Sequence, residues 1–389
     1  MPTPPPSRRP HLSVVPDVAQ DPAPPGEDTP GGDEPSSEER LAAARRHPVL
    51  ADTLRRGARD LAAEAGRRHH PGSPDRATPA SDEVVEAGTA YVRHLAAALS
   101  TGRPALFDEY LGWVTHLTSS PGIGSEELSG HLAVLAEVIA ERVAAEDAEV
   151  VGGLIERSLA SLPQSAPESA SYLDVHTELG ALGSEVLELL LAGDRHGAIT
   201  RVLEAADGGV GVEDLYLGVF QPCLWEVGRR WQSGRVTVAQ EHFVTAAIQL
   251  AMAQLYPRVF STPRVYRTVV VASVGGELHE LGGRMVADIF ELRGWDAHFV
   301  GANVPAGSVA DLAAKVEADI VAVSATLPSH LPDVEEVVRA VRARSDARVL
   351  VGGRPFNRVP DLWRVVGADG TAVDAVAAVE QAGRLVQEP

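Results

Sequence analysis

The chain has 389 residues, of which 44% are hydrophobic, so it is long enough for two or three domains that each bury a core. Its 54 acidic residues against 34 Lys and Arg give a formal net charge of −20, which argues against direct nucleic-acid binding, because phosphate contacts need clustered basic side chains. The single cysteine, Cys223, excludes an internal disulfide bond and any metal site built from several cysteines.

The N-terminal segment is rich in proline and polar residues. Residues 1–35 hold 11 of the 28 prolines, with Gly, Asp and Glu between them. Such a segment buries too little apolar surface to offset the entropy lost on ordering, so we predict a disordered tail over residues 1–37. The chain has no signal-peptide core and no run of about 18 apolar residues, and we expect a cytoplasmic protein without a membrane partner.

Two helical blocks are expected after the tail. Residues 38–163 are rich in Ala, Leu, Glu and Arg, with apolar side chains at helical spacing, and they predict a helical domain for signalling or interaction. A stretch rich in Ser and Pro at 161–171 is typical of a linker. A second helical block follows at 172–257.

From Thr268 onwards, short β-branched runs alternate with helical segments. Near-continuous apolar strands joined by helical crossovers are typical of a parallel sheet covered on both faces. We therefore predict an α plus α/β fold with a flavodoxin-like, five-stranded, Rossmann-like domain over 265–389, whose ligands bind at the carboxyl ends of the strands. The expected strands are 268–274, 296–301, 319–325, 347–353 and one near 370–373; the expected helices are about 279–293, 306–317, 331–344, 359–366 and 374–387.

The loop after the first predicted strand carries an acid and a histidine at this carboxyl edge. Glu277 lies two residues before His279, and the Gly282-Gly283 pair begins the following helix without side-chain bulk. A zinc-protease motif would need a second histidine at position 283, and the glycines lack the spacing of a dinucleotide fingerprint. These residues alone leave open a surface histidine without a role.

The carboxyl ends of the third and fourth predicted strands place hydroxyl groups and glycines at the same edge of the sheet. Ser324 and Thr326 lie at the end of the third predicted strand, and Gly352 and Gly353 lie at the end of the fourth. Hydroxyls beside glycines form a slot that a flat or elongated group can enter, with the backbone close to it. A slot beside one imidazole suggests a large metallocofactor that brings its own metal.

These motifs resemble those of the cobalamin-binding domain of methionine synthase, methylmalonyl-CoA mutase and related proteins, over roughly residues 265–385. The resemblance implies that His279 replaces the cofactor's dimethylbenzimidazole as the lower axial ligand of cobalt, while the displaced tail enters the slot. Glu277 stands where the family has Asp, and it would accept the second imidazole N–H. The matching motifs are Glu277-x-His279-x-x-Gly282, Ser324-x-Thr326 and Gly352-Gly353.

The second helical block ends in a predicted helical hairpin. Thr237 and Gln240 have the spacing of a capping box, so a helix is expected from Val238 to about Leu255. The preceding helix is expected from about Val212, with a kink at Pro222.

Trp231, Glu241 and His242 would meet at one end of this hairpin. An acid in the first helical turn also stabilises a helix through its dipole, so an ordinary capped hairpin remains an alternative. With the domain that follows, residues 172–260 resemble the four-helix cap of adenosylcobalamin-dependent photoreceptors related to MerR-type transcription regulators. The resemblance implies that Trp231 packs on the adenosyl group, and that Glu241 and His242 contact its ribose and adenine side.

The chain departs from the photoreceptors in two places. Gln232 stands where the best-known members have a histidine that ligates cobalt after illumination. The MerR-type DNA-binding domain is replaced by the tail and by residues 38–163, which lack the basic composition of a recognition helix. A regulatory signal would therefore be transmitted by contact with other proteins and not by direct binding to DNA.

The leading hypothesis is a non-enzymatic, cobalamin-dependent light-sensing regulator. It would bind adenosylcobalamin in preference to methylcobalamin and act through a protein partner, such as a transcription regulator, or through self-association into a homo-oligomer in one ligand state. The alternative is a corrinoid carrier protein for methyl transfer between methyltransferases, which would not need Trp231, Glu241 and His242. A mutase subunit is disfavoured, because no substrate barrel of about 250 residues is present.

Overall fold

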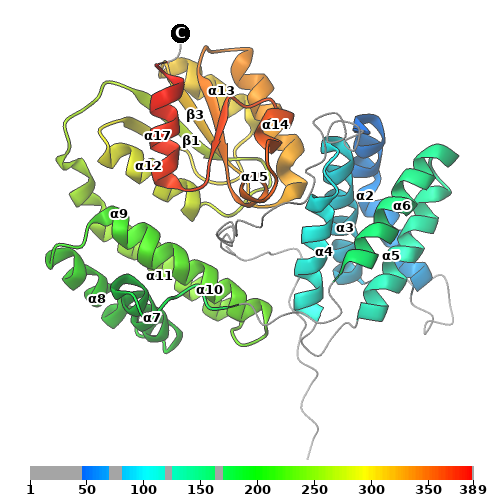
Figure 1. The fold of residues 1–389 in the computed structure, drawn as a ribbon, viewed down its shortest axis with the longest axis horizontal. Coiled ribbons are helices and arrows are strands. Elements are labelled where there is room, and N and C mark those ends of the chain that lie inside the picture. Colours follow the sequence, from blue (N-terminus) through cyan, green and yellow to red (C-terminus); the bar gives the residue numbers. More distant parts are fainter. Residues whose placement is uncertain (1–45, 70–80, 119–124, 163–169, 388–389) are drawn as a thin grey trace, which may run out of the picture.

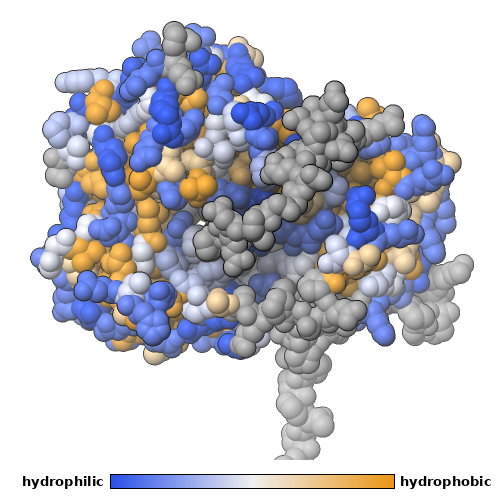
Figure 2. All heavy atoms as spheres, viewed as in Figure 1, coloured by the Kyte–Doolittle hydropathy of each residue, from blue (hydrophilic) through white to orange (hydrophobic). Residues whose placement is uncertain are grey.

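The computed structural model describes residues 46–69, 81–118, 125–162 and 170–387. They form a helical domain, a second helical bundle and a sheet domain, in chain order (Figure 1). The predicted tail at 1–37 lies outside the described residues. The face in Figure 2 is largely hydrophilic, as expected for a chain with a net charge of −20. Within the described ranges, no helix combines the length and apolar character needed to cross a membrane.

The helical domain packs helices around a leucine-rich core. Leu54, Leu95 and Leu132 come from three different helices, and each side chain is fully buried. The helix that begins at Asp82 follows a capping serine: the Ser81 hydroxyl accepts a hydrogen bond from the backbone N–H of Val84. The helices are α2 (Pro48–His69), α3 (Asp82–Thr101), α4 (Ala105–Thr118), α5 (Ser125–Ala140) and α6 (Ala145–Ser161).

The second bundle, called the cap below, contains the predicted hairpin. Its last helix begins at Val238 and ends at Leu255, behind the capping box of Thr237 and Gln240, as predicted. The turn before Pro222 is π-helical, because proline has no N–H to donate to the preceding turn. The elements are α7 (Glu178–Leu191), α8 (Arg195–Asp207), α9 (Val212–Leu215), η1 (Tyr216–Phe220), α10 (Gln221–Gln232) and α11 (Val238–Leu255).

The sheet domain has five parallel strands in the order β2-β1-β3-β4-β5, which confirms the flavodoxin-like prediction. The strand order reverses between β1 and β3, so a crevice is expected beside their carboxyl ends. The strands are β1 (Thr268–Ser273), β2 (Asp296–Phe299), β3 (Ile320–Ser324), β4 (Arg348–Gly352) and β5 (Gly370–Ala372). The longer helices are α12 (Leu281–Leu292), α13 (Ala306–Lys315), α14 (Leu331–Arg342) and α17 (Ala375–Leu385), and the shorter ones are η2 (Tyr256–Ser261), η3 (Pro328–His330), α15 (Arg354–Arg358) and α16 (Leu362–Val365).

The three central strands of the sheet are buried on both faces. Val270 and Val321 pack in one core with α13 and α14, whereas Val271 and Ile320 pack in another with α12 and α17. This explains the near-continuous apolar runs of the strands.

One predicted helix is wrong. The sequence predicts a single helix over 359–366, but α15 ends at Arg358 and α16 begins at Leu362. Val359 is extended because the ring of Pro360 disfavours helical geometry in the residue before it, and Asp361 then takes a φ of 60°.

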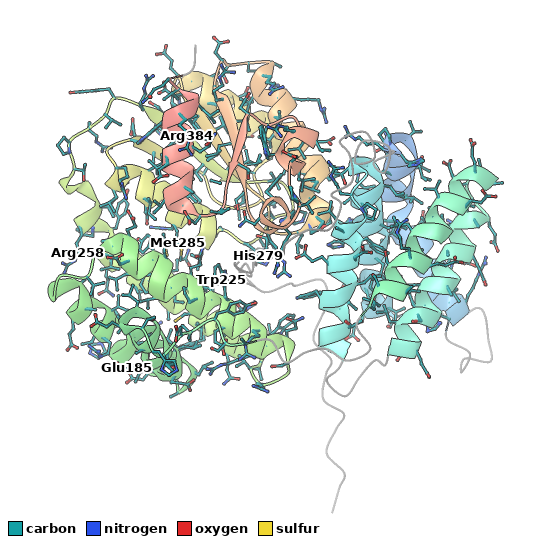
Figure 3. The ribbon with its side chains drawn as sticks, viewed as in Figure 1. Glu185, Trp225, Arg258, His279, Met285 and Arg384 are labelled. Atoms are coloured by element: carbon teal, nitrogen blue, oxygen red, sulfur yellow. The ribbon has the colours of Figure 1, made fainter. Side chains whose placement is uncertain are left out.

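The three parts pack against one another. Leu281 and Met285 of α12 belong to the apolar core of the cap, and Figure 3 shows Met285 on the cap side of the sheet domain. The core of the helical domain is continuous with the sheet core beneath α13 and α14. The Tyr216 hydroxyl donates to Asp288 Oδ2 at 2.8 Å, which adds a buried polar contact between cap and sheet domain.

This contact predicts a pH-dependent stability. Burial raises the pKa of Asp288 above the ordinary value of 3.8, and the hydrogen bond from Tyr216 and the charge of Arg284 offset this only in part. A raised pKa in the folded state means that the stability contributed by Asp288 is present below pH 3.8 and is lost as the pH rises through the shifted pKa. Asp288→Asn keeps the acceptor and removes the charge, so at pH 7 the variant should be more stable than the unmodified protein.

Urea unfolding of both proteins at several pH values tests this expectation. The gain from Asp288→Asn should shrink as the pH is lowered toward the ordinary pKa of aspartate. A gain that stays constant, or grows on acidification, would contradict the assignment.

Candidate cofactor site

The loop between β1 and α12 holds Glu277 and His279 together. Glu277 is fully buried, and His279 is 7% exposed. The imidazole Nδ1 of His279 donates to Glu277 Oε1, and the backbone N–H of His279 reaches the same oxygen at 3.0 Å. With its proton on Nδ1, a neutral imidazole carries its lone pair on Nε2, the form in which histidine binds metals. The hydrogen bond between Glu277 and His279 is the one that the sequence predicts, while cobalt ligation by His279 stays a prediction.

Two further groups hold the other oxygen of Glu277. The backbone N–H of Thr326 donates to Oε2 at 2.6 Å, and Nδ1 of His330 lies 3.1 Å from the same atom. Burial raises the pKa of Glu277, but the hydrogen bonds from His279 and His330 outweigh it and hold that pKa well below its usual range. The carboxylate is therefore ionised and fixed in position.

His330 is a site residue that the sequence motifs do not predict. It lies in η3, after the strand that ends at Ser324, and its spacing from Glu277 matches no motif. One feature of the sequence could have identified His330: it is the first histidine after the Ser-x-Thr motif, and this motif lies at the same edge of the sheet as Glu277.

A cavity beside this loop is lined by the predicted slot residues except Thr326, which lines a different cavity. Gly282, Ser324, Gly352 and Gly353 all border it, together with residues after β5. A Cβ on Gly282 would meet no atom within 4 Å, so the space there is open. Gly353 has a φ of 108°, and a Cβ there would meet the carbonyl oxygen of Ala325 at 2.2 Å, so the backbone itself requires glycine.

The cap residues of the predicted upper face lie in two settings. Glu241 is 1% exposed and accepts hydrogen bonds from His242 Nδ1 at 2.6 Å and from the Thr245 hydroxyl at 2.8 Å. The His242 side chain is 55% exposed. Trp231 is buried and packs against Trp113 of the helical domain, with ring centroids 6.4 Å apart. Glu241 and His242 thus form a pair, while Trp231 also faces another domain.

The cap lies over the histidine loop. Gln249 of α11 donates to Glu280 Oε1 at 3.2 Å, one residue beyond His279. Figure 3 shows His279 on the side of the sheet domain that faces the cap. A flat cofactor fits this arrangement, with one imidazole on the sheet side, helices opposite and a glycine-lined slot for a tail.

A doubly wound sheet with this histidine loop and slot, joined to a four-helix cap, defines a cobalamin-binding protein. Residues 267–380 match the family model described as a B12 binding domain, and residues 183–256 match a second model with the same description. The chain therefore contains two cobalamin-binding domains, and its cofactor is a cobalamin or a related corrinoid. The individual contacts of the residues above with cobalamin stay predictions.

The similar proteins are named as corrinoid proteins. Dimethylamine corrinoid protein 3 of Methanosarcina mazei is 28% identical over 170 residues, which are 41% of this chain and 98% of that protein. A corrinoid protein of Desulfitobacterium hafniense is 25% identical over 214 residues, which are 53% of this chain and 98% of that protein. The solved monomethylamine corrinoid protein of Methanosarcina barkeri is 21% identical, covers 53% of this chain and 98% of its own, and has a TM-score of 0.47.

These relatives correct the finer family prediction. None of these relatives is named as a light-responsive regulator, so their similarity supports cobalamin binding and gives no support to the photoreceptor hypothesis. They align over almost their full length and leave about half of this chain without a counterpart. The transcription-regulator partner predicted with the photoreceptor resemblance has no support among them.

Proposed function

We propose that the chain is a corrinoid carrier protein that holds a methyl group on cobalamin for exchange between partner methyltransferases, without being an enzyme itself. The observation that carries this proposal is the near full-length similarity to dimethylamine corrinoid proteins, combined with the Glu277–His279 pair beside the slot. Bound cobalamin would supply a cobalt–carbon bond that can be made and broken.

The residues of the chain would have separate tasks. His279 would ligate cobalt, while Glu277, held by Thr326 and His330, would fix the tautomer and orientation of that imidazole. The slot would hold the nucleotide tail. The cap would exclude water from the upper face until a partner displaces it.

A second candidate is a cobalamin-dependent, light-sensing regulator that acts through protein contacts. The helical domain favours it, because the alignments with the carriers leave about half of this chain unmatched and Trp113 of that domain packs on Trp231. In this candidate, the adenosyl group of adenosylcobalamin would fill the space under the cap. Loss of that group in light would change the packing of Trp231 and thereby the helical domain.

One experiment separates the two candidates. The full chain is loaded in the dark with methylcobalamin or with adenosylcobalamin, and its affinity, absorption spectrum and mass in solution are recorded before and after green light. A carrier should bind methylcobalamin at least as tightly as adenosylcobalamin and keep its mass in light. Tighter binding of adenosylcobalamin with a light-dependent change in mass would contradict the carrier proposal and support the sensor.

A matched pair of variants extends the test to the cap. Trp231→Ala should leave the relative affinity for the two cobalamins unchanged in a carrier, and should reduce a preference for adenosylcobalamin in a sensor. Trp225→Ala is the control, because Trp225 lies in the same helix and its ring packs against Tyr172, within the cap.

A further inference from the structure

Helix α4 of the helical domain contacts both the sheet domain and the cap. Its Glu109 Oε1 accepts a hydrogen bond from Arg354 Nε at 2.6 Å and lies 3.7 Å from Arg358 Nε. One helical turn later, Trp113 packs on Trp231, and its carbonyl oxygen accepts a hydrogen bond from Gln232 Nε2 at 3.0 Å. A single turn, about 6 Å long, therefore joins the two sides of the cofactor site.

The anchoring residues are direct neighbours of predicted cofactor residues. Arg354 follows Gly353 of the slot, and Gln232 follows Trp231 of the cap. Gln232 therefore holds the helical domain, at the position where the photoreceptors have a cobalt-capturing histidine. Trp113 packs against the apolar cores of both the helical domain and the cap.

The helical domain also reaches the loop below the lower ligand. Helix α3 packs against η3, which contains His330, the residue that holds Glu277. His94 and Tyr110 of the helical domain line a cavity together with Thr326 and Pro328. The domain therefore touches the sheet side of the site at two places and the cap at a third.

The ion pair at Glu109 is sheltered from solvent. The Glu109 side chain is 21% exposed and that of Arg354 is 19% exposed. Charges in such a position are screened less than those of a fully exposed pair, and a geometrically good pair between domains can stabilise their docking.

We propose that the helical domain is a third wall of the cobalamin site. Glu109, Trp113, Gln232 and Arg354 act as positioning residues that hold the cap and the sheet domain at the separation that cobalamin needs, without touching it. A ligand bound between two separate parts loses affinity when those parts must first be ordered, so a preformed spacing strengthens binding. The inference rests on cobalamin binding, which both candidate functions share.

A double-mutant cycle on the full chain tests this role. The dissociation constant and dissociation rate of hydroxocobalamin are measured for the unmodified protein, Glu109→Ala, Arg354→Ala and the double variant. Each single change should weaken binding about fivefold, the equivalent of about 1 kcal/mol for one sheltered pair. The double variant should have about the same dissociation constant as the single variant that binds less tightly, because both changes remove the same contact. Trp113→Ala should weaken binding to a similar or greater extent.

Glu141→Ala is the matched control. It removes an ion pair with Arg68 at 2.7 Å that lies wholly within the helical domain, and it should leave the dissociation constant within about twofold. Thermal unfolding without cofactor verifies that each variant is folded. The proposal is overturned if the Glu109 and Arg354 variants bind like the unmodified chain, if their effects are additive, or if Glu141→Ala weakens binding equally. The unmodified chain in the same titration tests cobalamin binding separately: if it binds tightly, an absent effect of the variants contradicts only the role of the helical domain.

Discussion

Replacing His279 with alanine is expected to weaken cobalamin binding by at least about 10- to 100-fold and to remove the spectrum of histidine-ligated cobalt. Loss of an outer partner of a metal ligand alone costs about that much, so loss of the ligand should cost no less. The imidazole is buried and its Nδ1 is held by Glu277, which fixes the orientation of Nε2 as a ligand. Absorption titration gives the affinity, and electron paramagnetic resonance of bound Co(II) cobinamide, a corrinoid without the nucleotide tail and its dimethylbenzimidazole, reports nitrogen ligation by the protein.

His298→Ala is the control for this change. His298 lies on β2 of the same domain, outside the histidine loop, and its side chain is 36% exposed. It should leave both the affinity and the nitrogen ligation unchanged. If His279→Ala kept the nitrogen signal with cobinamide, which brings no dimethylbenzimidazole of its own, the lower ligand would have to be another residue. The affinity of Glu277→Gln for cobalamin should lie between those of His279→Ala and His298→Ala, because the amide keeps an acceptor for the His279 N–H and loses the charge.

Replacing Gly282 with leucine is expected to abolish tight binding of cobalamin while leaving the empty protein folded. A Cβ at this position meets no neighbouring atom within 4 Å, and the residue borders the cavity that would receive the nucleotide tail. The nucleotide tail ends in the aromatic dimethylbenzimidazole, and a buried aromatic group covers about 150–250 Å² of surface. Exclusion of the tail should therefore cost at least about 100-fold in affinity.

Cobinamide, a corrinoid without the nucleotide tail, separates tail exclusion from a damaged site. Gly282→Leu should bind cobinamide almost as well as the unmodified chain does, because only the slot is filled. Gly307→Leu is the control: Gly307 is also the second residue of its helix, and a Cβ there would likewise meet no atom within 4 Å, but it lies outside the slot lining. Equal loss of cobinamide and cobalamin in Gly282→Leu would contradict the placement of the tail.

Much of the fold follows from local sequence. The apolar, β-branched runs predict the strands β1, β3 and β4 because these central strands are buried on both faces. Thr237 and Gln240 predict the first residue of α11 because both capping partners lie within one turn. The prediction around Pro360 is wrong because helical spacing of apolar residues carries less weight there than the restriction that a proline imposes on its predecessor.

The site divides in the same way. Its sheet-edge residues could be identified because the carboxyl ends of neighbouring parallel strands must share one edge. The relatives are named as corrinoid proteins, and they give no support to the light-sensing regulator that Trp231, Glu241 and His242 suggest. The motifs alone do not decide whether the space under the cap holds the adenosyl or the methyl group of the cofactor. The residues identified at the edge are Glu277, His279, Gly282, Ser324, Thr326, Gly352 and Gly353.

By itself, the sequence determined the parallel sheet, the histidine loop, the glycine slot and the capped hairpin, because each depends on residues close together in the chain or on the register of adjacent strands. Only the tertiary structure decided the partners that lie far apart. His330 meets Glu277 across 53 positions, Gln232 meets Trp113 across 119, and Arg354 meets Glu109 across 245. Such contacts depend on how whole domains pack, and no periodicity or spacing in the chain encodes that arrangement.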